Sequence, residues 1–400
     1  MKKAVKRFLS LVLTGILIVS AAVAINFGKN IFADTAAELS DVPPDEITDI
    51  GSPYKFFFDD LDIVEKEAYN RILKNIYDMP ERIRVPFISL EQLDKVFTAI
   101  LCDNPDLFFV ARTCSIRTTI MGTFCKIEYI LTPEEYAQRK AELDEACAEF
   151  LRSIEGIDDQ WKKELIIHDF VIDNCKYKHV DGDLTYSSAY GAIVNGEAAC
   201  EGYAKAAKYL FDAAGIESGV VSGTVDDPDG NPGSHMWNVV KFGDDFYHLD
   251  LTWDDPVNDA GEQMKLYAYF NVSDEAIAGT HSGFSRDYGC DSMEENYYVK
   301  TGSYFKSFSK EDEEKLSRTV AKVLDRGEKD VQLRFSNKEA YDSAVRRLIT
   351  NGGIYNVLVA AKNKTSAVFS TDKVTYYKDR GQCVLNFTVN VTGRAELTDG

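Results

Sequence analysis

Three residues with complementary chemistry follow one another along the chain: Cys200, His235 and Asp250. A thiol can act as a nucleophile, an imidazole can carry its proton, and a carboxylate can orient the imidazole. Together they are the groups of a nucleophilic acyl-transfer site. They can do this chemistry only if the local structure brings them together.

Cys200 is predicted to begin a helix. Apolar residues recur after it with helical spacing, and Gly215 ends the pattern. A thiol at a helix N-terminus lies beside unpaired backbone N–H groups and the positive end of the helix dipole, which favour the thiolate. A lone cysteine at such a position is more often a small buried apolar residue than a nucleophile. The assignment therefore depends on its neighbours.

His235 and Asp250 are placed on a predicted β-hairpin. Two strand-like runs flank the pair Gly243–Asp244, which is a turn signal. A two-residue loop sets His235 opposite Thr252 and puts His235 and Asp250 on one face, diagonally adjacent. A four-residue loop keeps this register, whereas a three-residue loop puts the two side chains on opposite faces. The hypothesis of a triad depends on that register.

Four strings around these residues resemble the transglutaminase-like cysteine enzyme superfamily, in its bacterial secreted branch. They are Ser188-Ala189-Tyr190-Gly191-Ala192, Ala199-Cys200-Glu201-Gly202-Tyr203-Ala204, His235-Met236-Trp237-Asn238 and Tyr247-His248-Leu249-Asp250-Leu251-Thr252-Trp253-Asp254-Asp255-Pro256. The resemblance covers about residues 160–275 and implies a papain-like α+β core. It also implies Cys200 as nucleophile, His235 as general base and then acid, and Asp250 as the group that orients the imidazole.

Further residues of these strings are candidates for supporting roles. Oxyanion stabilisation would come from the backbone N–H of the nucleophile and a second donor, for which Tyr190 is the candidate. A buried tyrosine with a satisfied hydroxyl is the alternative. His248 shares the face of the carboxylate and either supports it or is structural. Trp237 and Trp253 are expected as cleft walls or core.

Other polar groups are expected to be structural. His168, on a helix predicted over Trp161–Asn174, has no partner in the pattern, and Asp169 is expected to cap or pair locally. The Asp and Asn oxygens of the acidic loop 226–233 would suit calcium, but the loop lacks the alternating spacing and distal Glu of an EF-hand, so we expect a plain turn-rich loop. A position at the border of the substrate cleft is the secondary interpretation, because the loop leads directly into His235. No Cys-x-x-Cys pair for zinc occurs. The sequence therefore predicts no metal and no cofactor.

The composition is that of a secreted globular protein. The chain has 400 residues, 45% of them hydrophobic, and a formal net charge of −20. A charge of that sign argues against nucleic acid as a partner. It would favour basic, lysine-bearing substrates at the encounter stage. We expect a protein or peptide substrate, including substrates associated with the cell wall.

The N-terminus predicts export. Basic residues ending at Arg7 precede an apolar run from Leu9 to Phe27. Cleavage is expected after Ala24 or Ala33, and an uncleaved anchor is the alternative because the run is long enough to cross a bilayer. Either outcome puts the catalytic domain outside the cytoplasm, with membrane contact only through this segment.

The eight cysteines lack the tight spacing of a disulfide framework. An exported protein can form disulfides, and Cys114 and Cys125 could bridge neighbouring strands. With Cys200 set aside an odd number remains, so at least one other thiol stays unpaired in a monomer. The spacing assigns no pair.

The predicted organisation has five parts. They are a signal peptide or membrane anchor (1–33), a linker (34–54), an N-terminal α+β domain (55–155), the transglutaminase-like core (156–275) and a C-terminal α+β module (276–400). In the N-terminal domain the patterns predict helices over 61–77, 89–102 and 133–154 and strands over 107–110, 115–120 and 124–131. In the C-terminal module they predict helices over 309–325 and 338–350 and strands over 331–335, 368–377 and 383–391. A role in substrate positioning, wall binding or packing is expected for that module.

The predicted function is extracytoplasmic cysteine acyl transfer on carboxamide or peptide bonds, through a thioester on Cys200. Water as the acceptor makes the protein a protease or amidase, and a lysine amine makes it a transglutaminase. Nothing between Cys200 and Asp250 indicates an amine tunnel, so the sequence favours hydrolysis or mixed activity. The alternative is a surface adhesion or cell-wall-binding protein that uses the same fold as a scaffold without activity.

Overall fold

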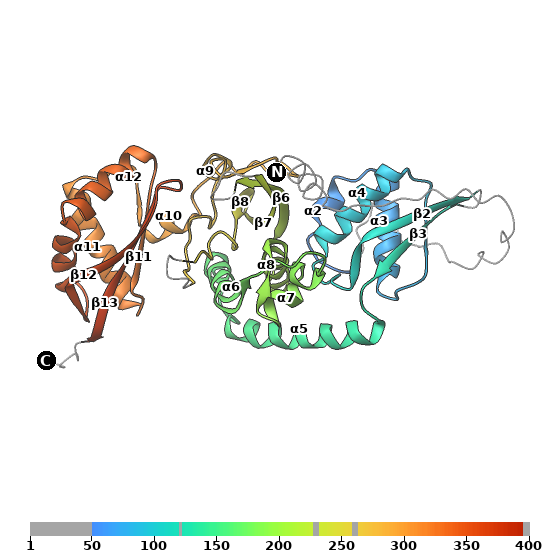
Figure 1. Ribbon diagram of the computed structural model, residues 1–400, viewed down its shortest axis with the longest axis horizontal. Helices are drawn as coiled ribbons and strands as arrows, with labels where there is room; N and C mark the ends of the chain where they lie inside the picture. The colour runs from blue at the N-terminus through green and yellow to red at the C-terminus, as the bar shows by residue number, and fades with distance from the viewer. Residues whose placement is uncertain (1–49, 120–121, 227–231, 258–262, 395–400) are drawn as a thin grey trace, which may run out of the picture. The chain divides into compact units, whose positions relative to one another are not determined.

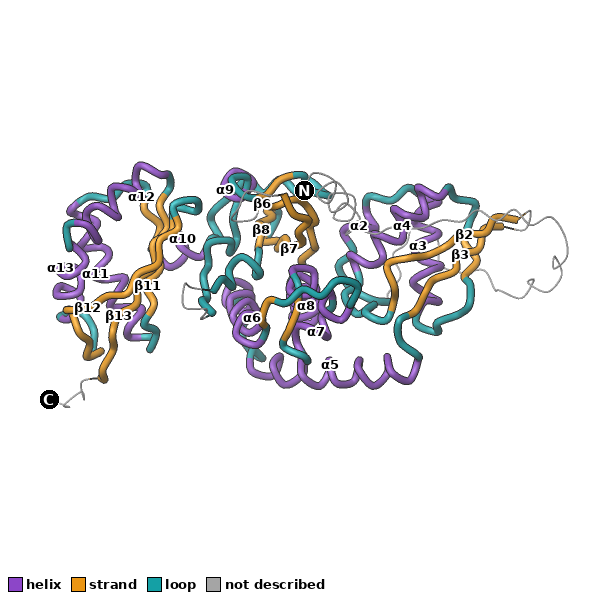
Figure 2. The backbone as a smooth tube through the Cα atoms, in the orientation of Figure 1, coloured by secondary structure: helices purple, strands orange, loops and turns teal. Residues whose placement is uncertain are grey.

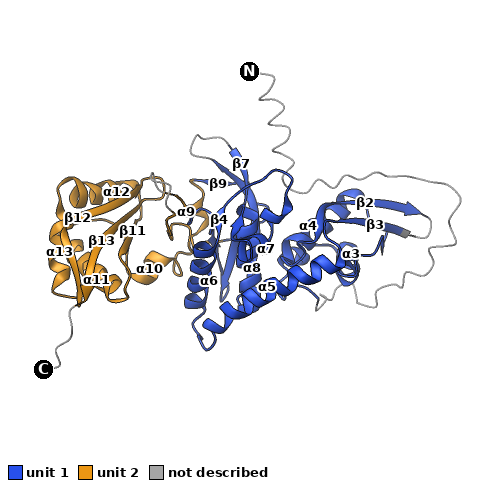
Figure 3. Cartoon of the chain, turned by 60° about the horizontal axis from the view of Figure 1, so that its bottom comes forward, with its two compact units in different colours: residues 1–255, 280–289 blue, residues 256–279, 290–400 orange. Residues whose placement is uncertain are grey.

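The computed structural model describes residues 50–119, 122–226, 232–257 and 263–394. The chain forms two compact units: unit 1 holds residues up to Asp255 together with 280–289, and unit 2 holds the rest (Figure 3). The predicted core, residues 156–275, contributes to both.

Three predicted segments fall wholly or partly outside the described residues. They are the signal peptide or anchor (1–33), the linker as far as residue 49, and residues 227–231 of the acidic loop. Within residues 50–119, 122–226, 232–257 and 263–394, no helix combines the length and the apolar character needed to span a membrane.

The N-terminal part of unit 1 pairs helices with a small antiparallel sheet. Its elements are α2 (Phe56–Asp59), α3 (Ile63–Ile76), β1 (Ile83–Val85), α4 (Leu90–Asp103), β2 (Val110–Thr119), β3 (Gly122–Tyr129) and α5 (Pro133–Ser153). The sheet has the order β1-β3-β2, and α3 packs against α4 and β1 (Figure 1). Capping boxes at Asp62, Ser89 and Thr132 start the three long helices. The predictions of these helices are confirmed.

The predicted strand over residues 107–110 is wrong. Leu107 and Val110 donate their backbone N–H groups to Asn104 and Leu107 in successive turns, and only Val110 joins the ladder. Leu107, Phe108 and Phe109 are all buried. The apolar run therefore reflects burial of a turn, which a short apolar run does not distinguish from a strand.

The second part of unit 1 is a helix packed on a twisted antiparallel sheet. Its elements are α6 (Gln160–Asn174), β4 (Lys176–Tyr177), the 3₁₀ turn η1 (Leu184–Ser187), α7 (Ala189–Ile193), β5 (Glu197–Ala198), α8 (Cys200–Ala214), β6 (Ser218–Asp226), β7 (Pro232–Phe242), β8 (Asp245–Leu249) and β9 (His281–Ser282). The sheet has the order β8-β7-β6-β9, and α8 packs against β6 and β7 (Figure 2). This helix-on-sheet arrangement positions the candidate residues, and it confirms the predicted α+β class.

Unit 2 is a second α+β body. Its elements are α9 (Asp274–Ile277), α10 (Tyr297–Thr301), β10 (Tyr304–Phe305), α11 (Lys310–Asp325), β11 (Asp330–Phe335), α12 (Lys338–Val345), the π turn η2 (Arg346–Thr350), α13 (Gly353–Lys362), β12 (Ala367–Asp379) and β13 (Val384–Arg394). The sheet has the order β10-β11-β13-β12, and its apolar face and α11 and α13 share one buried core. The predicted helices and strands of this module are confirmed. Helix α13 was not predicted.

Candidate active site

Cys200 is the first residue of α8, as predicted. The residue before it, Ala199, is extended and offers no side-chain cap, and Gly215 ends the helix with a positive φ of 72°. The sulfur therefore lies at a helix N-terminus whose first N–H groups have no intrahelical partner. All eight cysteines lie in the described part of the chain, none is joined in a disulfide, and Cys200 alone is not buried. The bridge considered between Cys114 and Cys125 is absent.

Two glycines let neighbouring elements approach the start of α8. A Cβ atom on Gly202 would lie 2.6 Å from the carbonyl oxygen of Tyr186, and one on Gly191 would collide with the carbonyl oxygen of Thr185. The backbone N–H of Ala199 donates to the same Tyr186 oxygen at 2.7 Å. The turn η1 therefore packs directly against Ala199 and the first turn of α8, and α7 packs directly against η1. This explains in physical terms why glycine occupies both strings.

The hairpin has the predicted register. Phe242 pairs with Asp245 and Asn238 with Leu249 around the Gly243–Asp244 turn, and Gly243 has a φ of 59°. The second strand is shorter than its apolar run, because β8 ends at Leu249. Asp250 follows directly and begins a turn.

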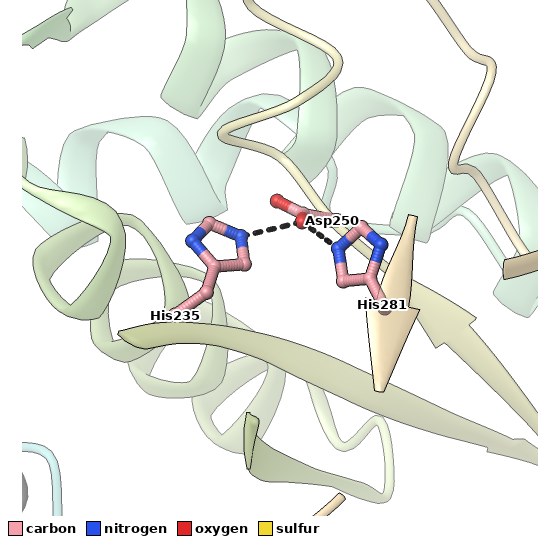
Figure 4. A group of neighbouring side chains, drawn as sticks. All are labelled: His235, Asp250 and His281. Carbon is pink, nitrogen blue, oxygen red and sulfur yellow. Dashed lines mark hydrogen bonds and ion pairs between the residues drawn. The ribbon is translucent and has the colours of Figure 1, made fainter. Parts of the chain in front are cut away.

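The carboxylate of Asp250 accepts four hydrogen bonds. The backbone N–H groups of Thr252 and Trp253 donate to Oδ1 at 2.9 and 3.1 Å. The Nε2 atoms of His235 and His281 both contact Oδ2, at 2.7 and 3.0 Å (Figure 4). Burial alone would raise the pKa of this carboxyl, but the His235 charge and these hydrogen bonds hold the pKa far below its usual value. Asp250 is thus a fixed, buried anion.

His235 is held in one orientation between a carboxylate and a thiol. Only 6% of its surface is exposed. Burial opposes protonation, but the Asp250 charge and hydrogen bond and then the Cys200 thiol raise the pKa of His235 to about 10. Because Nε2 is engaged with Asp250, Nδ1 is the ring nitrogen left for Cys200. The arrangement favours a protonated imidazole beside the Cys200 side chain at neutral pH.

The two tryptophans and His248 build an aromatic wall behind the site. Trp237 is buried, its ring lies parallel to that of His235 with centroids 5.8 Å apart, and its Nε1 donates to Nδ1 of His248 at 3.0 Å. His248 therefore contacts Trp237 rather than supporting the carboxylate directly. Trp253 is partly exposed and meets His281 at a centroid distance of 4.9 Å.

Tyr190 makes a contact that does not support its predicted role in the oxyanion site. Its hydroxyl donates to Oε2 of Glu142 on α5 at 2.6 Å, and its ring stacks on Phe108. A tyrosine hydroxyl has one hydrogen to donate, and that hydrogen is engaged with Glu142. The alternative considered from the sequence, a tyrosine with a satisfied hydroxyl, describes this contact.

Sequence patterns missed two neighbours of the site. His281 lies on β9, and no local motif marks it. Tyr177 lies on β4 beside Ala198; burial first, and then the charges of Cys200 and Asp250, raise its pKa. His168 is buried between Asp169 and Asp254, with nitrogen–oxygen distances of 3.0 and 3.3 Å, so it has the carboxylate partners that the pattern does not supply. Its structural role stays a prediction.

The three side chains of Figure 4 also have the composition of a metal site. The ligand atoms of His235, Asp250 and His281 lie within 4.8 Å of one another, and zinc accepts imidazole and carboxylate ligands. The same atoms make the hydrogen bonds that orient His235, so an ion bound there would replace those bonds. The expectation of chemistry without a metal or cofactor stays a prediction.

Comparison with known proteins returned one family match. Residues 148–251, which contain Cys200, His235 and Asp250, match the model of the transglutaminase-like superfamily. The solved structures that match include a candidate cysteine protease from Cytophaga hutchinsonii, at 16% identity and a TM-score of 0.23, covering 31% of this chain and 41% of that chain. They also include a TGase, at 13% identity and a TM-score of 0.26, covering 44% of this chain and 50% of that one. The chain thus spans at most half the length of either. No curated protein matches.

Proposed function

We propose that the protein is an acyl-transfer enzyme of the transglutaminase-like superfamily with Cys200 as nucleophile. The match of residues 148–251 to the model of that superfamily supports a cysteine-dependent enzyme. The observation that carries the proposal is the chain of contacts from the Cys200 thiol through His235 to Asp250, with an Nε2–Oδ2 distance of 2.7 Å. The substrates proposed are carboxamide or peptide bonds of proteins or peptides outside the cytoplasm.

The first half-reaction forms a thioester. The Cys200 thiolate attacks the carbonyl carbon, and the electron pair of the C=O bond moves to oxygen. The backbone N–H of Cys200 at the helix start is proposed to stabilise that oxyanion. His235 then gives its Nδ1 proton to the leaving nitrogen as the C–N bond breaks, so ammonia or an amine departs and neutral His235 remains.

The second half-reaction releases the acyl group. Neutral His235 takes a proton from water or from an amine, the new nucleophile attacks the thioester, and the C–S bond breaks to restore the thiolate and the imidazolium. Asp250 keeps the ring in place through both steps. Water leads to hydrolysis and a lysine amine to an isopeptide bond. We propose hydrolysis or mixed activity, because amine transfer requires a site that excludes water and orients the amine.

A product assay tests the proposal. The full chain is incubated with a glutamine-bearing protein and a labelled primary amine, and ammonia, incorporated amine and new peptide termini are measured together. We expect ammonia or new termini from the wild type and none from Cys200→Ala. Cys147→Ala, which removes a buried thiol on α5, is the matched control and is expected to stay active. Two results together would show a true transglutaminase instead of a hydrolase. The labelled amine would be incorporated stably with no new peptide termini, and no ammonia would be released when the amine is left out.

A further inference from the structure

A short segment of the chain leaves unit 2 and returns to unit 1. Residues 280–289 belong to unit 1, whereas 256–279 and 290–400 belong to unit 2 (Figure 3). Within the segment, β9 pairs antiparallel with β6, with His281 opposite Val225. The backbone N–H of Ser285 also donates to the carbonyl oxygen of Ser222 at 2.7 Å. The segment is therefore an added edge of the sheet that carries His235, and it lies beyond the family match, which ends at residue 251.

The side chain of His281 is held on four sides. Its Nε2 lies 3.0 Å from Oδ2 of Asp250, and its Nδ1 lies 2.8 Å from Oγ1 of Thr280. The ring meets Trp237 and Trp253 at centroid distances of 4.9 Å each, and only 2% of the residue is exposed. A ring fixed in this way presents one nitrogen to the carboxylate in a single direction (Figure 4).

The chemistry of the partners settles the proton positions on His281. The carboxylate can only accept, so Nε2 must carry a hydrogen and donate it. Burial lowers the pKa of His281, the Asp250 hydrogen bond and charge raise it, and the His235 charge lowers it again. The net direction is a lowered pKa, so a neutral ring is favoured. The neutral ring then accepts the Thr280 hydroxyl hydrogen at Nδ1. His281 is thus a neutral donor beside the charged His235.

Asp250 needs such a donor because the strand β8 supplies no hydrogen bond to the second oxygen of its carboxylate, Oδ2. The residue lies just after the end of β8, and the two backbone N–H groups of its turn hold only Oδ1. Oδ2 has two lone pairs in a fully buried place, and His235 occupies one of them. An unsatisfied lone pair on a buried carboxylate is costly, and a carboxylate held at one oxygen can rotate.

We propose that His281 is a positioning residue of the candidate site, whose Nε2–H holds Oδ2 of Asp250 in the orientation in which Oδ2 receives the hydrogen bond of His235. The inference rests on the proposed function, because it assigns His281 to the group that orients the imidazole. It adds to the site a fourth side chain from a segment outside the matched domain. His281 acts on the reaction through Asp250.

Two substitutions separate the donated hydrogen bond from packing. In His281→Gln the amide nitrogen can occupy the place of Nε2 and donate to Asp250, whereas the shorter His281→Asn side chain cannot reach it. The rate constant for alkylation of Cys200 by iodoacetamide at pH 7, in the full chain, reports the activated thiol without a substrate. We expect the rate to fall about 10-fold in His281→Asn, because a hydrogen bond to a charged group is lost. We expect His281→Gln to stay within about 3-fold of the wild type.

Further measurements exclude a loss of folding as the cause. His168→Asn removes another fully buried histidine, one bound to Asp254 outside the site, and is expected to leave the alkylation rate of the folded protein unchanged. Thr280→Val removes the hydroxyl at Nδ1 and is expected to lower the rate less than His281→Asn does. The chain has only five histidines, so side-chain nitrogen NMR can follow each ring. We expect His281 to be the neutral Nε2–H tautomer, and the His235 titration midpoint to move in His281→Asn but not in His281→Gln.

The outcomes are distinct. A folded His281→Asn with the wild-type alkylation rate and an unchanged His235 titration midpoint would overturn the inference. An equal loss of alkylation rate in His281→Asn and His281→Gln would also overturn it, because it would show that His281 acts by packing. If neither His281 variant folds, the tautomer of His281 in the wild type and the rate in Thr280→Val decide the question. A wild-type Cys200 that reacts no faster than an ordinary thiol would instead remove the proposed function itself.

Discussion

Replacing Asp250 by asparagine should disable His235 while keeping the shape of the site. The amide oxygen can still accept from the backbone N–H groups of Thr252 and Trp253. The amide nitrogen then faces Nε2 of His235, so a donor meets a donor unless the ring moves its proton to Nδ1. A ring with its hydrogen on Nδ1 cannot accept the thiol proton there. Asp250→Asn is therefore expected to remove the base rather than the fold.

The size of the effect follows from the electrostatics of the pair. A fall of the His235 pKa from about 10 to its ordinary 6.5 corresponds to a loss of about 5 kcal/mol from the protonated ring. The loss leaves Cys200 without a protonated imidazole beside it. The lowest alkylation rate expected for the variant is that of an ordinary thiol, of which about 3% is thiolate at pH 7. Iodoacetamide alkylation of Cys200 should slow by about 30-fold, and turnover should fall further because the proton donor is lost as well.

A matched control lies four residues along the chain. Asp254 is also fully buried and also bound to a histidine, His168, at 3.3 Å, but it is outside the candidate triad. Asp254→Asn should keep the alkylation rate of Cys200 within about 2-fold of the wild type, because the change leaves His235 and Asp250 untouched. Circular dichroism checks that both variants are folded. Equal alkylation rates in the wild type and a folded Asp250→Asn would refute the electrostatic reasoning.

Two further predictions concern the framework of the site. Burial opposes protonation of His168, but the hydrogen bonds and charges of Asp169 and Asp254 outweigh burial and raise the pKa of His168 to about 9. Protonated His168 therefore contributes fully to the free energy of unfolding below pH 6.5, and this contribution is lost as the pH rises through 9. The loss is about 3 kcal/mol. Urea unfolding followed by the fluorescence of the three tryptophans, all in unit 1, should show this loss in the wild type and not in His168→Gln, and equal pH slopes would contradict it. Gly202→Ala should destabilise unit 1 by about 1–3 kcal/mol and lower activity, because the added methyl meets the carbonyl oxygen of Tyr186. Gly279→Ala, where a Cβ meets nothing within 4 Å, should change neither, and a fully stable, active Gly202→Ala would show that the close approach is not needed.

The sequence predicted those parts of the site that depend on local rules. The start of α8 at Cys200 follows from helical periodicity and the stop at Gly215, and the meeting of His235 with Asp250 follows from the length of the Gly243–Asp244 turn. Both are short-range features, and both are confirmed. The roles of these residues in catalysis remain a proposal.

The features that the sequence missed depend on long-range contacts. His281 is separated from Asp250 in the sequence by residues 256–279, which belong to unit 2. The residues next to His281 in the sequence do not indicate that β9 pairs with β6. Tyr190 was assigned by its distance from Cys200 along the chain, whereas its hydroxyl partner, Glu142, lies on α5. The sequence of residues 107–109 predicts a strand where the structure has a turn, because a buried turn and a paired strand have the same kind of apolar run.

The most direct test of the central claim is a search for the acyl group on Cys200. The full chain is mixed with an activated acyl ester, p-nitrophenyl acetate, quenched in acid within seconds and mapped by mass spectrometry. We expect one acetyl group per chain, on the peptide that contains Cys200, no acetyl group there in Cys200→Ala, and much slower formation in His235→Ala. An acetyl group on another residue would rule out Cys200 as the nucleophile, and Cys200 acylated as fast in His235→Ala as in the wild type would rule out its activation by His235.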